Sequence, residues 1–249
     1  MSFWQTVRKL IMEADVVLLI LDARMPEISR NNELEKMIND FHKQLILVFN
    51  KIDLISEKQM EHLKSQTHKA FFVSGSKNIG ISKLKTNLLI LGKRLRIMPL
   101  KVGIVGYPNV GKSAVINALA KRARTNVAAY AGTTKGLQFV KVSKLKIIDS
   151  PGVIPFEDKE LKLGLIGAKN PEKLKHSQKL AVEIIKNFIQ NNKTALEEFY
   201  GIKLETEDEY EIIHAIGKRR GFLLKGGIVD ERRVALAIIM DWQKGRLRI

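Results

Sequence analysis

The sequence predicts an α/β fold, a doubly wound and mainly parallel sheet followed by a small all-α C-terminal domain. Short apolar runs alternate with helix-like segments over roughly the first 150 residues, as buried parallel strands and their crossover helices do. After about residue 170 only amphipathic helical spacing remains. Apolar residues make up 45% of the 249 residues, which is enough for a globular core. We place the domain boundary after residue 168, giving domains 1–168 and 169–249.

The first domain divides into predicted strands and helices in order. Strands are expected at 16–21, 45–49, 70–73, 102–105 and 147–148. The helix-like spacers are 31–41, 57–68, 81–93 and 112–121. Segments 137–142 and 145–149 flank Ser143 and Lys144, which predicts an antiparallel hairpin.

The second domain reads as helices at 171–190, 194–200, 208–220 and 231–244. Asp230 is a candidate N-cap for the last helix, and Gly245 is its stop signal. Segment 226–230 therefore predicts a tight turn that leads into a helix, and turn chemistry alone could explain its residues.

The chain has no cysteine, which excludes disulfides and cysteine metal sites and favours an intracellular setting. The apolar run at 16–21 ends at Asp22, so it is too short for a signal peptide or a membrane span. We expect a monomeric cytoplasmic protein without a membrane partner.

The net charge of +17 is concentrated in one part of the chain. Residues 62–148 hold 17 of the 43 lysines and arginines and no aspartate or glutamate. The basic residues without a phosphate-loop role include Lys93, Arg94, Arg96, Lys121, Arg122, Arg124, Lys141, Lys144 and Lys146. This acid-free block predicts a polyanionic partner, and we favour RNA. For any single lysine, a solvated surface is the simpler explanation.

Segment 106–113, Gly-Tyr-Pro-Asn-Val-Gly-Lys-Ser, is a phosphate-binding loop between a predicted strand and a predicted helix. Its backbone amides and the helix N-terminus form an anion site. Lys112 is expected to reach the β and γ phosphates, and the Ser113 hydroxyl to bind Mg²⁺. The expected nucleotide contacts are Asn109, Val110, Gly111, Lys112 and Ser113.

Asn50-Lys51-Ile52-Asp53 follows the predicted strand at 45–49 and predicts guanine recognition. A carboxylate at Asp53 accepts from both N1–H and the exocyclic amine of guanine, a pattern that adenine lacks. The Lys51 stem would cover the ring, and Asn50 would tie this loop to the phosphate loop.

Ser74, Gly75 and Ser76 follow the next strand and fit backbone support for the guanine carbonyl. A serine-glycine turn alone is the alternative.

Asp149-Ser150-Pro151-Gly152 ends the last predicted strand and matches a D-x-x-G motif. Asp149 is expected to hold Mg²⁺ through water, and the Gly152 amide to sense the γ phosphate. Upstream, Gly132-Thr133-Thr134 offers a threonine to complete the metal shell, and we favour Thr134 over Thr133.

Read cyclically from the phosphate loop, these motifs follow the usual GTPase order, but rotated. The chain therefore resembles the circularly permuted P-loop GTPases of the YlqF family. Segments 22–26, Asp-Ala-Arg-Met-Pro, and 29–31, Ser-Arg-Asn, are similar to that family's opening signatures. For Asp22 and Arg24, a salt-bridged strand-end turn and a role near the switches remain equal alternatives. The resemblance implies GTP and GDP as ligands and assembly of the large ribosomal subunit as the role.

The resemblance extends to the helical tail, through Arg220-Gly221, Gly226-Gly227, Asp230, Arg233 and Asp241-Trp242. Two departures stand out. Bacterial members begin with a Pro-Gly-His-Met segment whose histidine is linked to hydrolysis, whereas here no histidine precedes His42. Ala131 also stands where many relatives have proline.

Hydrolysis is expected to be slow, because Val153 replaces the glutamine that orients water in small GTPases. Asn109 matches the asparagine by which related GTPases hold an activating K⁺, although it could simply stabilise the loop turn. We assign catalytic roles to Lys112, Asn109 and Thr134. The leading hypothesis is a GTP-hydrolysing assembly factor that binds rRNA through the basic face and Lys218-Arg219-Arg220. A GTP-gated RNA chaperone with incidental hydrolysis is the alternative, and an RNA-modification accessory GTPase is third.

Overall fold

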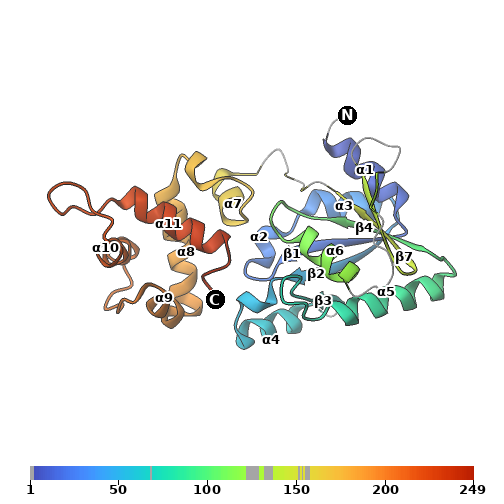
Figure 1. The fold of residues 1–249 in the computed structure, drawn as a ribbon, viewed down its shortest axis with the longest axis horizontal. Coiled ribbons are helices and arrows are strands. Elements are labelled where there is room, and N and C mark those ends of the chain that lie inside the picture. The colour runs from blue at the N-terminus through green and yellow to red at the C-terminus, as the bar shows by residue number, and fades with distance from the viewer. Residues whose placement is uncertain are drawn as a thin grey trace. The chain divides into compact units, whose positions relative to one another are not determined.

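The computed structural model describes residues 3–67, 69–121, 129–131, 137–150, 152, 154 and 158–249. It divides the chain into two compact units, Met1–Phe156 and Glu157–Ile249 (Figure 1). The boundary expected after residue 168 falls inside the second unit. The reason is the helix α7 (Glu160–Leu165), which packs against α8 (Ser177–Asn191) and α11 (Glu231–Gln243).

The first unit contains a mainly parallel seven-stranded sheet, which confirms the predicted fold class. The strand order is β3-β2-β1-β4-β7-β6-β5. The strands are β1 (Val16–Asp22), β2 (Gln44–Asn50), β3 (Ala70–Phe72), β4 (Leu100–Val105), β5 (Ala129–Ala131), β6 (Gln138–Val142) and β7 (Leu145–Asp149). In this order, the neighbours among β3, β2, β1, β4 and β7 pair in parallel. Strand β6 is antiparallel to β7, and β5 is antiparallel to β6. The predicted hairpin is β6–β7, with Ser143 at φ +56° in its turn.

Helices cover both faces of the sheet (Figure 1). They are α1 (Phe3–Glu13), α2 (Pro26–Ser29), α3 (Asn32–Asp40), α4 (Glu57–Gln66), α5 (Ile81–Leu95) and α6 (Lys112–Lys121). The predicted strands and helices of this unit agree with these bounds to within two residues. The sequence reading missed α1, α2 and β5. The last two are short, with four and three residues, too few to show a period.

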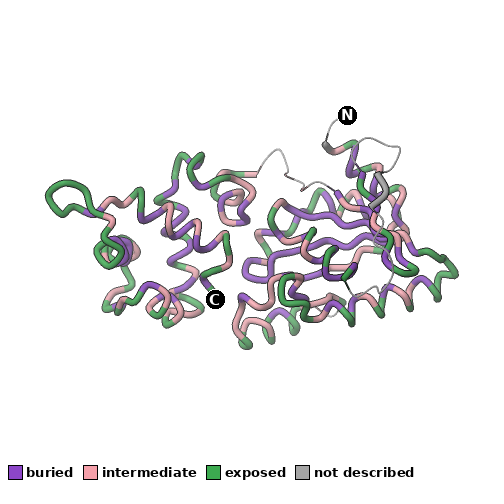
Figure 2. Tube along the Cα trace, viewed as in Figure 1, coloured by how far each residue is buried: buried purple, intermediate pink, exposed green. Residues whose placement is uncertain are grey.

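Strand β1 lies in the interior of the sheet, between β2 and β4, and all seven of its residues are buried (Figure 2). Its Val17, Leu19 and Leu21 join the core cluster that also contains residues of α1 and α3. Helix α5 contacts β4, and helix α6 contacts β7. Leu84 of α5 and Leu119 of α6 are among the buried residues of these helices. A strand buried on both faces explains why residues 16–21 read as a continuous apolar run.

Helix α1 packs against β4 at a glycine. A Cβ atom at Gly103 would lie 2.7 Å from Cδ2 of Leu10 and 3.0 Å from Cβ of Ala14. The first distance is shorter than real Cβ contacts and the second is unusually tight, so the glycine allows the helix to approach the sheet closely. Val7, Leu10 and Ile11 of α1 are fully buried. The helix is therefore part of the core.

The second unit is helical, as predicted. Its remaining elements are η2 (Pro171–Lys173), α9 (Lys193–Tyr200) and α10 (Glu209–Arg220). The single helix expected at 171–190 is wrong, because Leu174 is extended at ψ 128° and separates η2 from α8. Asp230 caps α11 by accepting from the backbone N–H of Arg233 at 3.0 Å, and Gly245 has φ +67°, as its role as a stop signal requires.

Two aromatic rings mark the core of the second unit. Phe188 and Trp242 meet edge to face with their ring centroids 6.0 Å apart. The indole Nε1–H of Trp242 donates to the carbonyl of Leu165 at 2.9 Å, which fastens α11 to the end of α7. None of the helices in the described ranges has the length and apolar character needed to cross a membrane.

We predict that Leu10→Ala lowers the free energy of unfolding by about 2–4 kcal/mol, because it leaves a cavity between α1 and β4. Met12, on the same helix, is 57% exposed, so Met12→Ala should change stability by less than about 0.5 kcal/mol. Urea denaturation of the two variants checks this. Equal effects would show that α1 is not part of the core.

Candidate nucleotide-binding site

The predicted site residues follow neighbouring parallel strands at their carboxyl ends. Asp22 ends β1, Asn50 ends β2, Asp149 ends β7, and Ser74 and Gly106 lie just after β3 and β4. The carboxyl ends of parallel strands form one edge of a sheet, which is where α/β proteins bind ligands. The rotated motifs of the sequence therefore meet on one side of this unit.

The phosphate loop between β4 and α6 has the backbone that its glycines suggest. Gly106, Asn109 and Gly111 have φ angles of +144°, +60° and +96°. A Cβ atom at Gly106 would lie 2.5 Å from the carbonyl oxygen of Ile20. The backbone N–H of Val115 donates to the Gly111 carbonyl at 3.0 Å and continues the loop into α6. The helix N-terminus thus follows directly from the loop, as an anion site requires.

Lys112 is buried beneath the loop. Its Nζ donates to the carbonyls of Gly106 at 3.0 Å and Tyr107 at 2.8 Å. Burial lowers the pKa of Lys112 to about 8, and the negative charge of Asp149 opposes that effect only in part. A bound phosphate would give this ammonium group a negatively charged partner in place of the two neutral carbonyls.

Asp149 offers an oxygen suited to a metal ion. Its Oδ1 is buried and has no hydrogen-bond partner within the described part of the chain. Burial raises the pKa of Asp149, and Lys112 opposes the shift. Ser150 holds the end of β7 against β4 by donating from Oγ to the Ile104 carbonyl at 2.9 Å. A buried carboxylate oxygen without a hydrogen-bond partner is suited to bind a cation or to accept a hydrogen bond from a metal-bound water.

The donor set as a whole fits Mg²⁺. The described ranges contain no group of three or more His, Cys, Asp or Glu residues able to hold a metal. Mg²⁺ commonly takes one or two protein oxygens and completes its shell with water and phosphate. Asp149 and the exposed Ser113 are the described candidates. Gly132, Thr133 and Thr134 lie outside the described residues, so the choice of threonine stays a prediction.

Gly152 of the D-x-x-G motif lies against the phosphate loop. A Cβ atom built on it would come within 2.6 Å of the backbone nitrogen and Cα of Pro108. Only glycine allows this approach, which brings the end of the β7 segment to the loop. Pro151 and Val153, on either side, are not among the described residues.

The side chain of Asn50 connects three loops. Its Nδ2 donates to the Val110 carbonyl at 2.8 Å, the tie to the phosphate loop expected from the sequence. Its Oδ1 accepts from the backbone N–H of Gly75 at 3.0 Å. A Cβ atom at Gly75 would lie 2.7 Å from the backbone carbon of Ala114, so this glycine packs directly on α6.

Asp53 is carried by the short 3₁₀ helix η1 (Ile52–Leu54), and its Oδ1 is buried without a hydrogen-bond partner among the described residues. Ser74 and Ser76 form a turn beside it, with their hydroxyl oxygens 3.1 Å apart. The Ser74 hydroxyl also accepts from the backbone N–H of Lys77 at 3.1 Å. A guanine N–H donor would satisfy a buried acceptor that lacks a partner in the described part of the chain.

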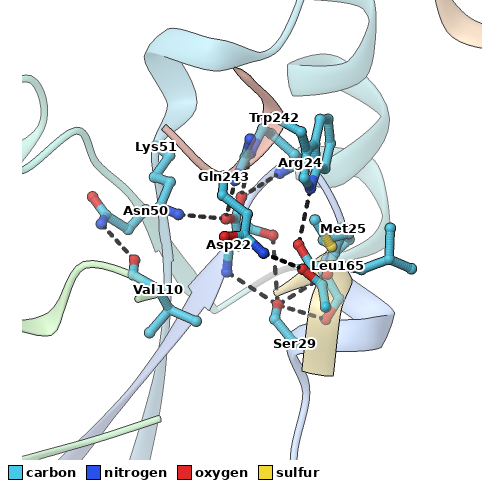
Figure 3. A network of polar contacts seen from close by, with 12 residues as sticks. Asp22, Arg24, Met25, Ser29, Asn50, Lys51, Val110, Leu165, Trp242 and Gln243 are labelled. Carbon is cyan, nitrogen blue, oxygen red and sulfur yellow. Dashed lines mark hydrogen bonds and ion pairs between the residues drawn. The ribbon is translucent and has the colours of Figure 1, made fainter. Parts of the chain in front are cut away.

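Asp22 forms the salt-bridged turn that was one of its two sequence alternatives (Figure 3). Its carboxylate binds Arg24, with Oδ2 2.8 Å from Nη2. The sequence reading missed the second partner, Lys51, whose Nζ lies 2.7 Å from Oδ2. Burial would raise the pKa of Asp22, but the charges and hydrogen bonds of Arg24 and Lys51 outweigh it and hold the pKa at about 2.

The pairing of Asp22 with Lys51 follows from the strand register, which the sequence motifs do not state. Asp22 and Asn50 are register partners on adjacent strands, so the residue after Asn50 lies beside Asp22. The neighbouring Ser29 accepts from the backbone N–H of Asp22 at 3.0 Å and caps the same turn. The two opening signatures at 22–26 and 29–31 are therefore parts of one structure.

Known proteins share this architecture. The family model described as RsgA GTPase matches residues 3–158, and the model described as 50S ribosome-binding GTPase matches residues 101–216. The GDP-bound structure of Thermotoga maritima YlqF superimposes with a TM-score of 0.61 at 22% identity, covering 97% of this chain and 95% of that one. At that identity the likeness shows the fold alone.

Sequence relatives extend the match. An uncharacterized GTP-binding protein of Methanocaldococcus jannaschii is 40% identical and covers 97% of this chain, which spans 65% of that relative. Nuclear/nucleolar GTPase 2 of Arabidopsis thaliana is 34% identical over 98% of this chain, which spans 43% of it. Ribosome biogenesis GTPase A of Bacillus cereus is 30% identical, covering 94% of this chain and 84% of its own length. With this match and the rotated motifs on one sheet edge, the chain belongs to the circularly permuted, YlqF-like GTPase family.

Proposed function

We propose that the chain binds GTP and GDP, hydrolyses GTP, and acts in assembly of the large ribosomal subunit through contact with rRNA. The observation that carries the nucleotide assignment is the buried Oδ1 of Asp53, which has no hydrogen-bond partner among the described residues and lies in a loop that Asn50 fastens to the phosphate loop. The ribosomal role is supported by relatives named as ribosome biogenesis and nucleolar GTPases.

Each part of the nucleotide has a proposed partner. Asp53 accepts from N1–H and the exocyclic amine of guanine, while Ser74, Gly75 and Ser76 support its carbonyl. The amides of Asn109, Val110, Gly111, Lys112 and Ser113 surround the phosphates. Lys112 exchanges its two loop carbonyls for phosphate oxygens and regains a full positive charge there. Its pKa of about 8 implies partial proton uptake when nucleotide binds near that pH.

For hydrolysis, Mg²⁺ held by Ser113, Thr134 and, through water, Asp149 would neutralise charge on the phosphates. Gly152 would meet the γ phosphate with its backbone N–H. The side chain of Val153 cannot orient water, so the intrinsic rate should be slow. Asn109 is exposed in the loop and is our candidate ligand for an activating K⁺.

The RNA assignment rests on the basic block at 62–148. A groove of about 420 Å³ runs between β2, β3 and α5. Lys69, Lys83 and Arg94 line it, together with Phe71 and Ile90, and Ile90 is 57% exposed. Cations beside an apolar floor suit a single strand, which offers phosphates and stacking bases together.

The alternative is a GTP-gated RNA chaperone whose hydrolysis is incidental. It is favoured by the valine at position 153, whose side chain cannot orient the attacking water. Both functions need the same guanine and phosphate contacts. They differ in whether turnover rises when the ribosomal partner binds.

We predict that Asp53→Asn weakens GDP binding by about 10- to 100-fold, because an amide cannot accept from both guanine donors and leaves one unpaired. The same variant should bind xanthosine diphosphate more tightly than wild type does, since the 2-carbonyl of xanthine accepts from the new amide. Calorimetric titration measures both. Asp40→Asn, an identical change at an exposed residue, is the control. Unchanged GDP affinity in Asp53→Asn would rule out this guanine contact.

We predict faster GTP hydrolysis in potassium than in sodium buffer, with the difference removed by Asn109→Ala. Phosphate release is measured at matched ionic strength, with and without large ribosomal subunits. Equal rates in the two salts would contradict the K⁺ proposal. Turnover that stays at background in every condition would favour the chaperone alternative.

We predict that Lys83→Glu/Arg94→Glu weakens binding to large-subunit rRNA. The slope of log K against log salt concentration should become shallower by the amount expected for the loss of about two phosphate contacts. Gel-shift titrations at several salt concentrations measure this, with GDP affinity as the check on folding. The control is Lys141→Glu/Lys144→Glu, the same charge change at exposed residues of the block that do not line the groove. Equal losses in both variants would assign binding to overall charge.

A further inference from the structure

The carboxylate of Asp22 joins the end of β1 to the segment that carries Asp53. It is fully buried, and each of its oxygens has partners. Oδ1 accepts from the backbone N–H of Arg24 at 3.1 Å and from its Nε at 3.0 Å. Oδ2 meets Nη2 of Arg24 at 2.8 Å and Nζ of Lys51 at 2.7 Å. Arg24 therefore contacts both oxygens and fixes the carboxylate, and Oδ2 is shared between Arg24 and Lys51 (Figure 3).

Lys51 has a conformation that needs such a partner. Its φ is +68°, a region that lysine seldom occupies, and it directly precedes η1. The side chain is only 19% exposed, and burial lowers the pKa of Lys51 while the charge of Asp22 opposes that shift. Without Asp22, the ammonium group would lose its one ion-pair partner, and the repulsion from the nearby guanidinium of Arg24 would exceed the weaker attraction of Asp53.

The turn from Lys51 onward sets the direction of Asp53. The Lys51 carbonyl accepts from the backbone N–H of Leu54 at 2.9 Å, which closes η1. The Asn50 carbonyl accepts from the backbone N–H of Ala23 at 2.8 Å, so the Asp22 turn contacts this segment a second time. Moving Lys51 would therefore move the carboxylate of Asp53.

We propose that Asp22 is a positioning residue for guanine recognition: it holds Lys51 in its left-handed conformation and so aims Asp53 at the base. This inference rests on the proposed GTP site. It gives the Asp-Ala-Arg turn at 22–24 a role in base specificity, exerted through Lys51 without contact to the nucleotide.

The test is a double-mutant cycle of wild type, Asp22→Asn, Lys51→Met and Asp22→Asn/Lys51→Met. Calorimetry gives the affinity of each protein for GDP and for inorganic pyrophosphate, which uses the phosphate loop alone. Asp22→Asn should weaken GDP binding about tenfold and leave pyrophosphate affinity within about twofold. The double variant should bind GDP no more weakly than Lys51→Met. Glu35→Gln, which breaks the partly exposed Arg30–Glu35 pair, should match wild type.

Each other outcome contradicts the inference. Additive GDP losses would mean that Asp22 does not act through Lys51, and equal losses for GDP and pyrophosphate would make it a general support of the fold. Should Asp22→Asn not fold, Asp22→Glu keeps the charge and displaces Lys51 by the length of one methylene. GDP affinity unchanged in that variant would likewise overturn the inference. If wild type binds pyrophosphate but not GDP, the proposed function itself is wrong.

Discussion

The side chain of Asn50 is the contact on which the rest of the candidate site depends. Its amide binds Val110, 60 residues away in sequence, and its carbonyl binds Gly75, 25 residues away. It is 2% exposed, so water cannot replace either bond without cost. The position of Gly111 follows from this arrangement, because a Cβ atom there would lie 2.1 Å from the Asn50 amide nitrogen. One buried side chain thus sets the distance between the proposed base-reading and phosphate-binding loops.

The permuted order of the chain does not separate these loops in space. Strands β2 and β4 carry them, and only β1 lies between the two in the sheet. Any residue at the carboxyl end of β1 is therefore beside both loops. Asp22 occupies that place, which explains why its turn contacts both Asn50, the last residue of β2, and Lys51, the next residue. The buried strand β1 thus lies between the two halves of the site, and its acidic end contacts the base-reading half.

Much of the fold could be predicted because β1 and β4 are buried parallel strands, and such strands leave continuous apolar runs. The domain edge was harder. Helix α7 has six residues, and its membership in the second unit depends on contacts that α8 and α11 make with it. Helix α1 was missed although it is amphipathic, and the glycine that receives it, Gly103, lies 90 residues beyond its end. Pairings over such separations depend on tertiary structure.

The same contrast holds for the site. Short motifs identify Asn50, Asp53, Lys112 and Asp149, because the chemistry of each motif depends on only a few consecutive residues. The link between Asp22 and Lys51 depends on strand register, which the motifs do not state. The most direct measurement is calorimetric titration of the chain with GDP and with ADP in Mg²⁺ buffer. A carboxylate that reads guanine predicts GDP binding at least about 100-fold tighter than ADP binding. Equal affinities, or ADP the tighter ligand, would contradict the assignment.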